Sequence, residues 1–357
     1  MYAQFLHLLQ HFPYLGAWQK RGLALWNSGV VLAGACRVSA VADALVAPER
    51  PSVEALEKRL SRFLHNERVS DELLSQAWVG WVVERYVSAH WVVLVDETKL
   101  SDHLSVMMVS LAYQQRAIPL LWRCYCPSAY PPEGQVALIR ELLARLRLWV
   151  PSRIALTVQA DRGIGTSPDL IRELELLGLM YLLRVQGQTR VRLANRQVHP
   201  LAQMVKPGET WCGRVEVFKK AGWLPLWVCI YWRVGERSPW CLVTNCRWRC
   251  PADYALRAWQ EQSFRDLKSF GFHWNASHVW QPAHAQRLLF ILALAYTWVL
   301  SQALLHTPAE PLSPSRQHPR QSLFRRGLRW VRHQLALTKT PSFSLDLHFH
   351  PPSPLLC

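Results

Sequence analysis

Acidic residues are scarce in this 357-residue chain, which has 25 Asp and Glu against 41 Lys and Arg and a formal net charge of +16. This excess of positive charge predicts a polyanionic partner: nucleic acid is favoured, and an anionic membrane surface comes second. Half of the residues are hydrophobic, which excludes a wholly disordered chain. The length predicts one large domain with additions, or two to three domains.

The sequence also lacks the marks of a zinc domain and of a secreted protein. Cys241, Cys246 and Cys250 have spacings of four and three intervening residues but no second half of a zinc motif, so structural zinc is not expected. The N-terminal residues have no basic region or small-residue cleavage site of a signal peptide. We therefore expect a cytoplasmic protein whose cysteines are reduced thiols.

One uncharged stretch, residues 288–305, is just long enough to be considered as a membrane span. Polar residues such as Tyr296 and Gln302 interrupt it, and a single marginal span fits a buried helix of a large core better. We expect no membrane partner.

The first 90 residues or so predict short helices, because apolar spacing and cap residues recur along them. Such helices are expected at residues 18–35, 38–46 and 53–65, and another begins at Ser70. The interspersed Arg and Lys residues would let these helices dock on DNA as in a helix-turn-helix arrangement. A helical cap packed on the main domain explains the same pattern equally well.

Two aspartates stand at the ends of apolar runs. Residues 91–95 predict a strand buried on both faces that ends in Asp96, and residues 154–158 predict another that leads to Asp161. A carboxylate at such a place can be held rigidly for metal binding, although a lone Asp there is often only a turn or cap residue.

The segments around these aspartates complete the pattern of an α/β protein. Residues 105–113 and 117–125 predict two strands with residues 114–116 as the turn, which gives an antiparallel meander with the first strand. A helix is expected at residues 135–148, and residues 181–244 are strand-like, which predicts a mainly β insertion.

Residues 254–268 predict an amphipathic helix with a reactive polar face. At about 100° per residue, one stripe holds Tyr254, Arg257, Glu261 and Lys268. A carboxylate flanked by two cations and a phenol suits a site that holds a divalent metal and a phosphate together. The alternative is a solvated face with an ordinary Arg–Glu pair four residues apart.

Asp96, Asp161 and Glu261 together are what two divalent ions need if they are to activate a water or a 3′-hydroxyl and stabilise the leaving oxygen. Oxygen ligands suit Mg²⁺, with Mn²⁺ as a substitute. Alternation along the strand predicts that Glu97 points to the face opposite Asp96. The remaining acids considered, Asp169, Glu173 and Asp266, are expected to be surface or helix-cap residues.

The segment Tyr254-(2)-Arg257-(3)-Glu261-(6)-Lys268 resembles, without a departure in type or spacing, the Tyr-Arg-Glu-Lys signature of the insertion-sequence-four family of DDE transposases. The contexts of Asp96 and Asp161 are similar to those of that family's first two acids. The resemblance extends from about residue 5 to about residue 335. It implies an α/β fold: a ribonuclease H-like catalytic core with a mainly β insertion and an N-terminal helical DNA-binding region.

The resemblance also assigns roles and boundaries. The catalytic and metal-binding residues would be Asp96, Asp161 and Glu261, and the DNA-binding residues would be Tyr254, Arg257, Lys268 and Arg265. The divisions would be an N-terminal helical region at 1–88, the two parts of the core at 89–185 and 251–305, the insertion at 186–250, and a linker, basic helix (322–335) and disordered tail within 306–357.

The function implied is that of a prokaryotic, nucleoid-associated enzyme that binds terminal inverted repeats of double-stranded DNA and carries out Mg²⁺-dependent cleavage and strand transfer. A homodimer would hold two DNA ends, and a hairpin intermediate would be expected in this family. A DNA-binding remnant without catalysis and a structure-specific nuclease on the same fold remain as alternatives, with a membrane protein as a remote one.

Overall fold

The computed structural model describes residues 1–46, 52–247, 251–307 and 321–337. The α-helices are α1 (Tyr2–Leu8), α2 (Ala17–Ala33), α3 (Val38–Leu45), α4 (Val53–Leu64), α5 (Asp71–Arg85), α6 (Gly134–Trp149), α7 (Arg162–Gly165), α8 (Pro168–Leu176), α9 (Ala258–Lys268), α10 (Pro282–His306) and α11 (Leu323–Ala336). The strands are β1 (His90–Ser101), β2 (Leu104–Tyr113), β3 (Arg116–Tyr125), β4 (Ala155–Ala160), β5 (Met180–Val185), β6 (Arg190–Arg192), β7 (Val198–Pro200), β8 (Thr210–Val217), β9 (Leu224–Tyr231) and β10 (Trp240–Thr244).

The strands of the described residues form a ten-stranded sheet in the order β3-β2-β1-β4-β5-β10-β9-β8-β6-β7. β1, β2 and β3 are the predicted antiparallel meander, and β4 and β5 add to it in parallel. The continuously apolar runs are central strands because both of their faces are covered. This mixed α/β fold is consistent with the predicted ribonuclease H-like core.

The end of the first strand and the start of the third were predicted wrongly. β1 does not end at Val95 but continues to Ser101, because its residues 93–101 pair with β2 beyond the point where pairing with β4 stops. The turn after β2 holds only Gln114 and Gln115, both with positive φ, 47° and 60°. Positive φ at both central residues matches a two-residue hairpin, whose twist suits the flanking strands. Arg116 is therefore the first residue of β3 rather than part of the turn.

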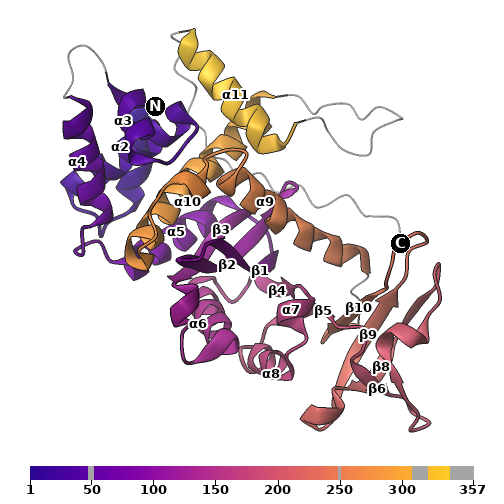
Figure 1. The fold of residues 1–357 in the computed structure, drawn as a ribbon. Coiled ribbons are helices and arrows are strands. Elements are labelled where there is room, and N and C mark those ends of the chain that lie inside the picture. Colours follow the sequence, from indigo (N-terminus) through magenta and orange to yellow (C-terminus); the bar gives the residue numbers. More distant parts are fainter. Residues whose placement is uncertain (47–51, 248–250, 308–320, 338–357) are drawn as a thin grey trace.

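Helices cover both faces of the core strands (Figure 1). α6 lies on the face of Glu97, whose carboxylate accepts a hydrogen bond from Gln135 at 3.0 Å. α9 lies on the other face, where Lys268 donates to the hydroxyl of Thr98 at 3.0 Å. The alternation of side chains along β1 therefore separates Glu97 from Asp96 and Thr98, as expected.

The predicted N-terminal helices are confirmed as α2 to α5; α2, α4 and α5 pack on α10, and α5 also packs on β3 and α6. α10 is long and apolar enough to cross a membrane, but nearly all of its apolar stretch is buried inside the protein. Phe5 and Phe12 from the N-terminal region pack on its Trp298 and Phe290. The composition of α10 is thus that of a central core helix.

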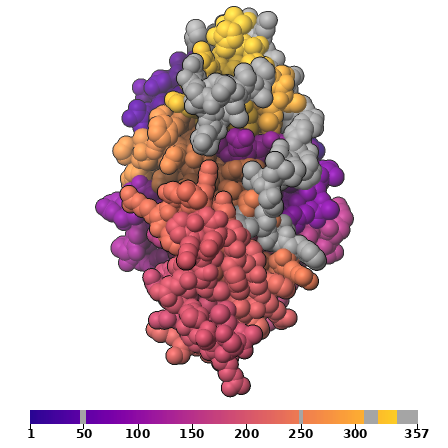
Figure 2. Space-filling view, turned by 90° about the vertical axis from the view of Figure 1, so that its right-hand side faces the viewer, coloured from indigo at the N-terminus to yellow at the C-terminus, as the bar shows by residue number. Residues whose placement is uncertain are grey.

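The strands within the predicted insertion, β6 to β10, continue the same sheet, because β10 pairs with β5. These strands form the lower part of the face toward the viewer in Figure 2. Cys212 and Cys229 lie directly opposite each other on β8 and β9 and form a disulfide. The expectation of reduced thiols throughout was wrong at this pair, which bridges neighbouring strands within the insertion.

Part of the outer edge of β3 is covered by one side chain of α10. The amide of Gln286 donates to the carbonyl oxygen of Trp122 at 3.0 Å and accepts from the backbone N–H of Cys124 at 3.1 Å. These two bonds satisfy backbone groups that a neighbouring strand would otherwise bind.

The basic helix expected at 322–335 is confirmed as α11, and its Arg325, Arg329 and Arg332 are exposed. Most of the predicted linker and all of the predicted tail lie outside the described residues, as does Cys250.

Candidate active site

Asp96 and Asp161 are brought together by strand register. Val95 of β1 pairs with Ala160 at the end of β4, so each aspartate is the first residue beyond the same parallel pair. Asp96 Oδ1 accepts from the N–H of Glu97 at 3.0 Å. Asp161 Oδ1 accepts from the N–H groups of Gly163 and Ile164 at 2.9 and 3.2 Å. Each aspartate thus uses one oxygen locally and leaves Oδ2 for the centre of the site.

The glycine at the end of α7 explains how the Asp161 loop fits against the sheet. A Cβ at Gly165 would lie 2.4 Å from the carbonyl oxygen of Arg184 on β5. Only glycine allows the backbone to approach a neighbouring strand this closely.

The signature segment is not one continuous α-helix, as its periodicity predicted. Residues 251–257 form a 3₁₀ helix, η5 (Pro251–Arg257), and α9 begins at Ala258. Tyr254 is buried, and its hydroxyl donates to the carbonyl oxygen of Ala160 at 3.2 Å. Its phenol therefore fixes η5 against the end of β4, one residue before Asp161.

α9 is held on the sheet by three polar side chains spaced three residues apart. Gln260 donates to the carbonyl oxygen of Met108 at 3.2 Å, and Ser263 accepts from the N–H of Ala117 at 2.7 Å. Asp266 accepts from the Arg116 guanidinium at 2.6 Å. Residues at this spacing share one helix face, so Glu261 faces away from this contact toward the aspartates.

The expectation that Asp266 is a surface or cap residue was wrong, because it is 4% exposed. Its carboxylate also accepts from the hydroxyls of Tyr296 on α10 and Ser322, the N-cap of α11. One buried carboxylate thus connects α9 with the sheet, α10 and α11. The other two acids are as expected: Asp169 is exposed in an ion pair with Arg172, and Glu173 lies 3.6 Å from Arg140.

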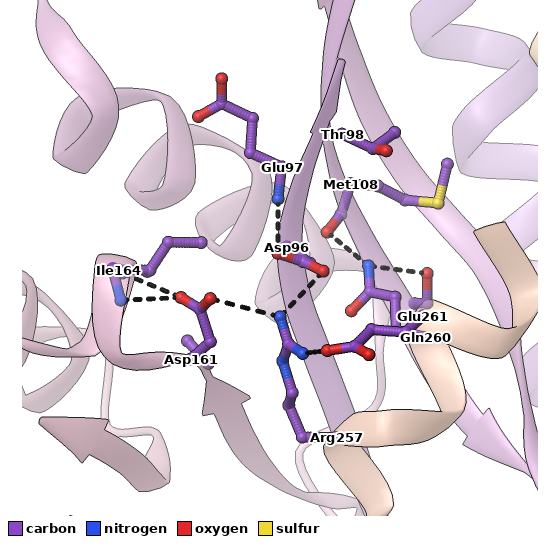
Figure 3. Close-up of polar contacts among 12 residues, drawn as sticks. Asp96, Glu97, Thr98, Met108, Asp161, Ile164, Arg257, Gln260 and Glu261 are labelled. Carbon is purple, nitrogen blue, oxygen red and sulfur yellow. Dashed lines mark hydrogen bonds and ion pairs between the residues drawn. The ribbon is translucent and has the colours of Figure 1, made fainter. Parts of the chain in front are cut away.

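The three predicted catalytic carboxylates meet at the guanidinium of Arg257 (Figure 3). Its Nη2 lies 3.0 Å from Asp96 Oδ2 and 3.4 Å from Asp161 Oδ2. Its Nη1 donates to Glu261 Oε1. The structure therefore brings together one residue from β1, one from the end of β4 and one from α9.

The other predicted DNA-binding residues lie around this centre in different settings. Lys268, at the end of α9, donates to the hydroxyl of Thr98 and, at 2.6 Å, to the carbonyl oxygen of Lys99. Arg265 is exposed on α9. In Figure 3 the carboxylate of Glu97 points away from the centre.

Burial shifts the pKa values of two side chains at this centre. It raises the pKa of Asp96 to about 6, with the neighbouring Asp161 charge adding to the rise and Arg257 opposing it. Burial also lowers the pKa of Lys268, although the charge of Asp96 acts in the other direction. One guanidinium charge faces three carboxylates, so the site retains a preference for further positive charge.

The donor set fits a divalent metal. Three carboxylates from separate elements converge on a single cation, and carboxylate oxygens are the ligands that Mg²⁺ and Mn²⁺ prefer. In their present spacing, however, no group of three or more His, Cys, Asp or Glu side chains among the described residues could hold a metal ion. The Arg257 guanidinium lies between the carboxylates that would have to close on the ion.

Residues 133–298 match the family model of the transposase DDE domain. This stretch covers a little under half of the chain and includes Asp161 and Glu261. The match supports a DDE transposase, a class of enzyme that acts on DNA and generally uses divalent metal ions, and it does not distinguish the insertion-sequence-four subgroup. The chain matches no curated protein.

Sequence reasoning missed two parts of this site. The sequence predicted that Arg257 binds a DNA phosphate. The contact of Arg257 with both aspartates was missed because it depends on strand register and on the placement of η5. The i, i+4 spacing of Arg257 and Glu261 did indicate their pairing. Sequence reasoning also missed the anchoring of α9 by Gln260 and Ser263, whose signal is polar residues at helical spacing on a buried face.

The raised pKa of Asp96 predicts a pH-dependent stability in metal-free protein. Because the folded-state pKa of about 6 lies above the ordinary aspartate value of 3.8, protonation stabilises the fold; this contribution is complete below pH 3.8 and is lost as the pH rises through 6. The contribution of Asp96 protonation to the free energy of unfolding is about 3 kcal/mol in full. About half of it is lost between pH 5 and pH 8.

Asp96→Asn removes this titration. The free energy of unfolding is measured by urea denaturation in the presence of EDTA. The value for Asp96→Asn minus the value for the parent should rise by about 1.5 kcal/mol from pH 5 to pH 8. Asp169→Asn, which changes a carboxylate away from this centre, is the control for the substitution itself. A difference between Asp96→Asn and the parent that stays constant over this pH range would contradict the raised pKa of Asp96.

Proposed function

We propose that this protein is a cut-and-paste DNA transposase of the insertion-sequence-four family. It would bind the terminal inverted repeats of its element, cleave the strand with an activated water, and join the freed 3′-hydroxyl to target DNA. The observation that carries the proposal is the convergence of Asp96, Asp161 and Glu261, which lie far apart in the sequence, on one cation.

In this proposal the three carboxylates would hold Mg²⁺, with Mn²⁺ as a substitute. The metal, when bound, supplies activation of the attacking oxygen and stabilisation of the leaving oxygen. The protein's own contribution is positioning: the β1–β4 register sets the two aspartates, and the buried face of α9 sets Glu261.

The proposed DNA contacts surround this centre. Arg257, Lys268 and Arg265 would bind phosphates close to the cleavage point, while the buried Tyr254 would act by holding η5 beside Asp161. The exposed arginines of α11 and the basic residues of the N-terminal helices would bind more distant phosphates, which carry most of the affinity for DNA. A homodimer would hold the two DNA ends together during cleavage.

The test uses the purified full-length chain with linear DNA that carries the inverted repeats found beside its reading frame. Cleavage at the repeat ends and insertion into a target plasmid are expected with Mg²⁺ or Mn²⁺ and not with EDTA. End binding without cleavage in either metal would reject the transposase in favour of a DNA-binding remnant. Cleavage without strand transfer would identify a nuclease instead.

A further inference from the structure

We infer that Arg257 is a built-in counter-ion which occupies the place of the divalent metal in the DNA-free protein, so that metal binding requires its guanidinium to leave. This inference rests on the proposed function, because it concerns the same three carboxylates. It goes further in assigning to Arg257 a control of metal loading that is separate from any contact with DNA.

The same oxygens would serve both cations. Asp96 Oδ1 and Asp161 Oδ1 are engaged by backbone N–H groups, so only their Oδ2 atoms are directed at the centre. Both Oδ2 atoms bind Nη2 of Arg257, and Glu261 Oε1 binds Nη1. A metal that recruited these oxygens would have to replace every one of these contacts.

The size of the guanidinium keeps the carboxylates too far apart for a metal. Mg²⁺ binds oxygens at about 2.0–2.1 Å in a nearly octahedral arrangement, whereas Nη2 lies 3.0 and 3.4 Å from the two aspartate oxygens. This spacing explains why no described carboxylate cluster could hold a metal as it stands. The ligands can close on an ion only after the guanidinium has moved.

The guanidinium is held firmly but is incompletely satisfied. The side chains of Arg257 and Asp96 are 11% and 13% exposed, so water does little to screen that ion pair, whereas Asp161 and Glu261 are 38% and 48% exposed. The Nε of Arg257 is buried without a hydrogen-bond partner among the described residues, which carries a desolvation penalty. A single positive charge also leaves two of three carboxylate charges unbalanced. A divalent ion can therefore compete, but it must first overcome the existing contacts.

The inference predicts that removing the charge of Arg257 tightens metal binding. Calorimetric titration of Mg²⁺ and of Mn²⁺ into the DNA-free, full-length protein compares the parent with Arg257→Met, which keeps a long apolar stem without the charge. We expect the metal dissociation constant of Arg257→Met to be at least about tenfold lower than that of the parent, because a like charge no longer opposes the ion. Arg257→Lys, which keeps the charge, should remain close to the parent.

The matched control is Arg145→Met. Arg145 pairs with Glu141 at i, i+4 and 2.7 Å on α6, so the substitution removes the same charge from a similar pair that does not contact the three carboxylates. Its metal affinity should equal that of the parent. Equal tightening in this control would show that overall charge, rather than the position of Arg257, is responsible, and would overturn the inference.

Thermal unfolding supplies a second measurement that shows whether the variants fold. Without metal, Arg257→Met should unfold at a lower temperature than the parent, since three carboxylates then face one another without a cation. Added Mg²⁺ should raise its unfolding temperature more than it raises that of the parent. If the folded variant binds metal no more tightly than the parent, or binds none, Arg257 is not a competing counter-ion.

These results are independent of DNA cleavage. If metal binding tightens as expected but the parent does not cleave repeat ends, the counter-ion inference stands and the proposed function fails. If the parent cleaves and transfers DNA but Arg257→Met binds metal as weakly as the parent, only the counter-ion inference fails.

Discussion

Asp96→Asn, Asp161→Asn and Glu261→Gln are each expected to reduce Mg²⁺-dependent DNA cleavage by at least about 100-fold, because loss of a ligand should exceed the 10–100-fold effect of losing a residue that merely orients one. Each substitution keeps the shape of the side chain and removes the negative charge directed at the centre. The measurement is the single-turnover rate of cleavage at a repeat end. DNA affinity is determined in parallel without divalent metal, so that a loss of binding is not mistaken for a loss of chemistry.

Glu97→Gln is the matched control for these variants. It makes the same change of charge one residue along β1, on a side chain that contacts Gln135 on the opposite face. Its cleavage rate should stay within about twofold of the parent, as expected for a substitution away from the site. If the three centre variants cleave as fast as Glu97→Gln, these carboxylates are not the catalytic set.

The second large effect is expected in stability, at the buried pair of Arg116 and Asp266. The side chains of the two residues are 9% and 5% exposed, and they join the start of β3 to α9. Arg116→Met would leave the Asp266 carboxylate buried without its cation. We expect the free energy of unfolding to fall by about 3–5 kcal/mol, the usual consequence of breaking a buried ion pair on one side.

Urea unfolding at pH 7 measures this effect, with Arg172→Met as the control. Arg172 forms an ion pair with Asp169 in which both side chains are largely exposed, and such pairs contribute no more than about 1 kcal/mol. The double variant Arg116→Met with Asp266→Leu should recover part of the loss, because it removes the uncompensated charge. A loss below about 1 kcal/mol in Arg116→Met would show that water or the hydroxyls of Tyr296 and Ser322 can replace the guanidinium.

Local patterns in the sequence predicted the main elements of the fold. Continuous apolar runs predicted β1 and β4, and an uncharged stretch predicted the buried α10, because burial on all sides requires apolar residues throughout. The end of pairing was harder to predict. Asp96 lies inside β1, since β2 continues to pair with that strand after β4 has ended.

The candidate carboxylates were predictable because each has a local signature. Their common partner was not, since the place of Arg257 depends on how η5 packs against β4 and how β4 pairs with β1. Helical periodicity at 100° per residue also assigned Tyr254 to a polar face. A 3₁₀ helix has three residues per turn, so the true segment presents its side chains differently.

Buried polar residues were the other source of error. Arg116 and Asp266 are separated by 150 positions, and charged residues are almost never fully buried unless they are paired. The sequence interpretation therefore placed Asp266 at the surface or at a helix cap, and Arg116 in the turn before β3. The Cys212–Cys229 disulfide was missed for a related reason: which cysteines lie opposite each other depends on the β8–β9 register, which the sequence does not reveal.

The side chain of Gln286 bears on how copies of this chain can assemble. By bonding the carbonyl oxygen of Trp122 and the N–H of Cys124, its amide does near the end of the outer strand β3 what an added strand would do there. At the other end of the sheet, β7 has only three residues and ends in Pro200, and a short edge with proline is a poor template for strand addition. At these two places we therefore expect copies of the protein to associate through side-chain surfaces rather than by adding a strand to the sheet.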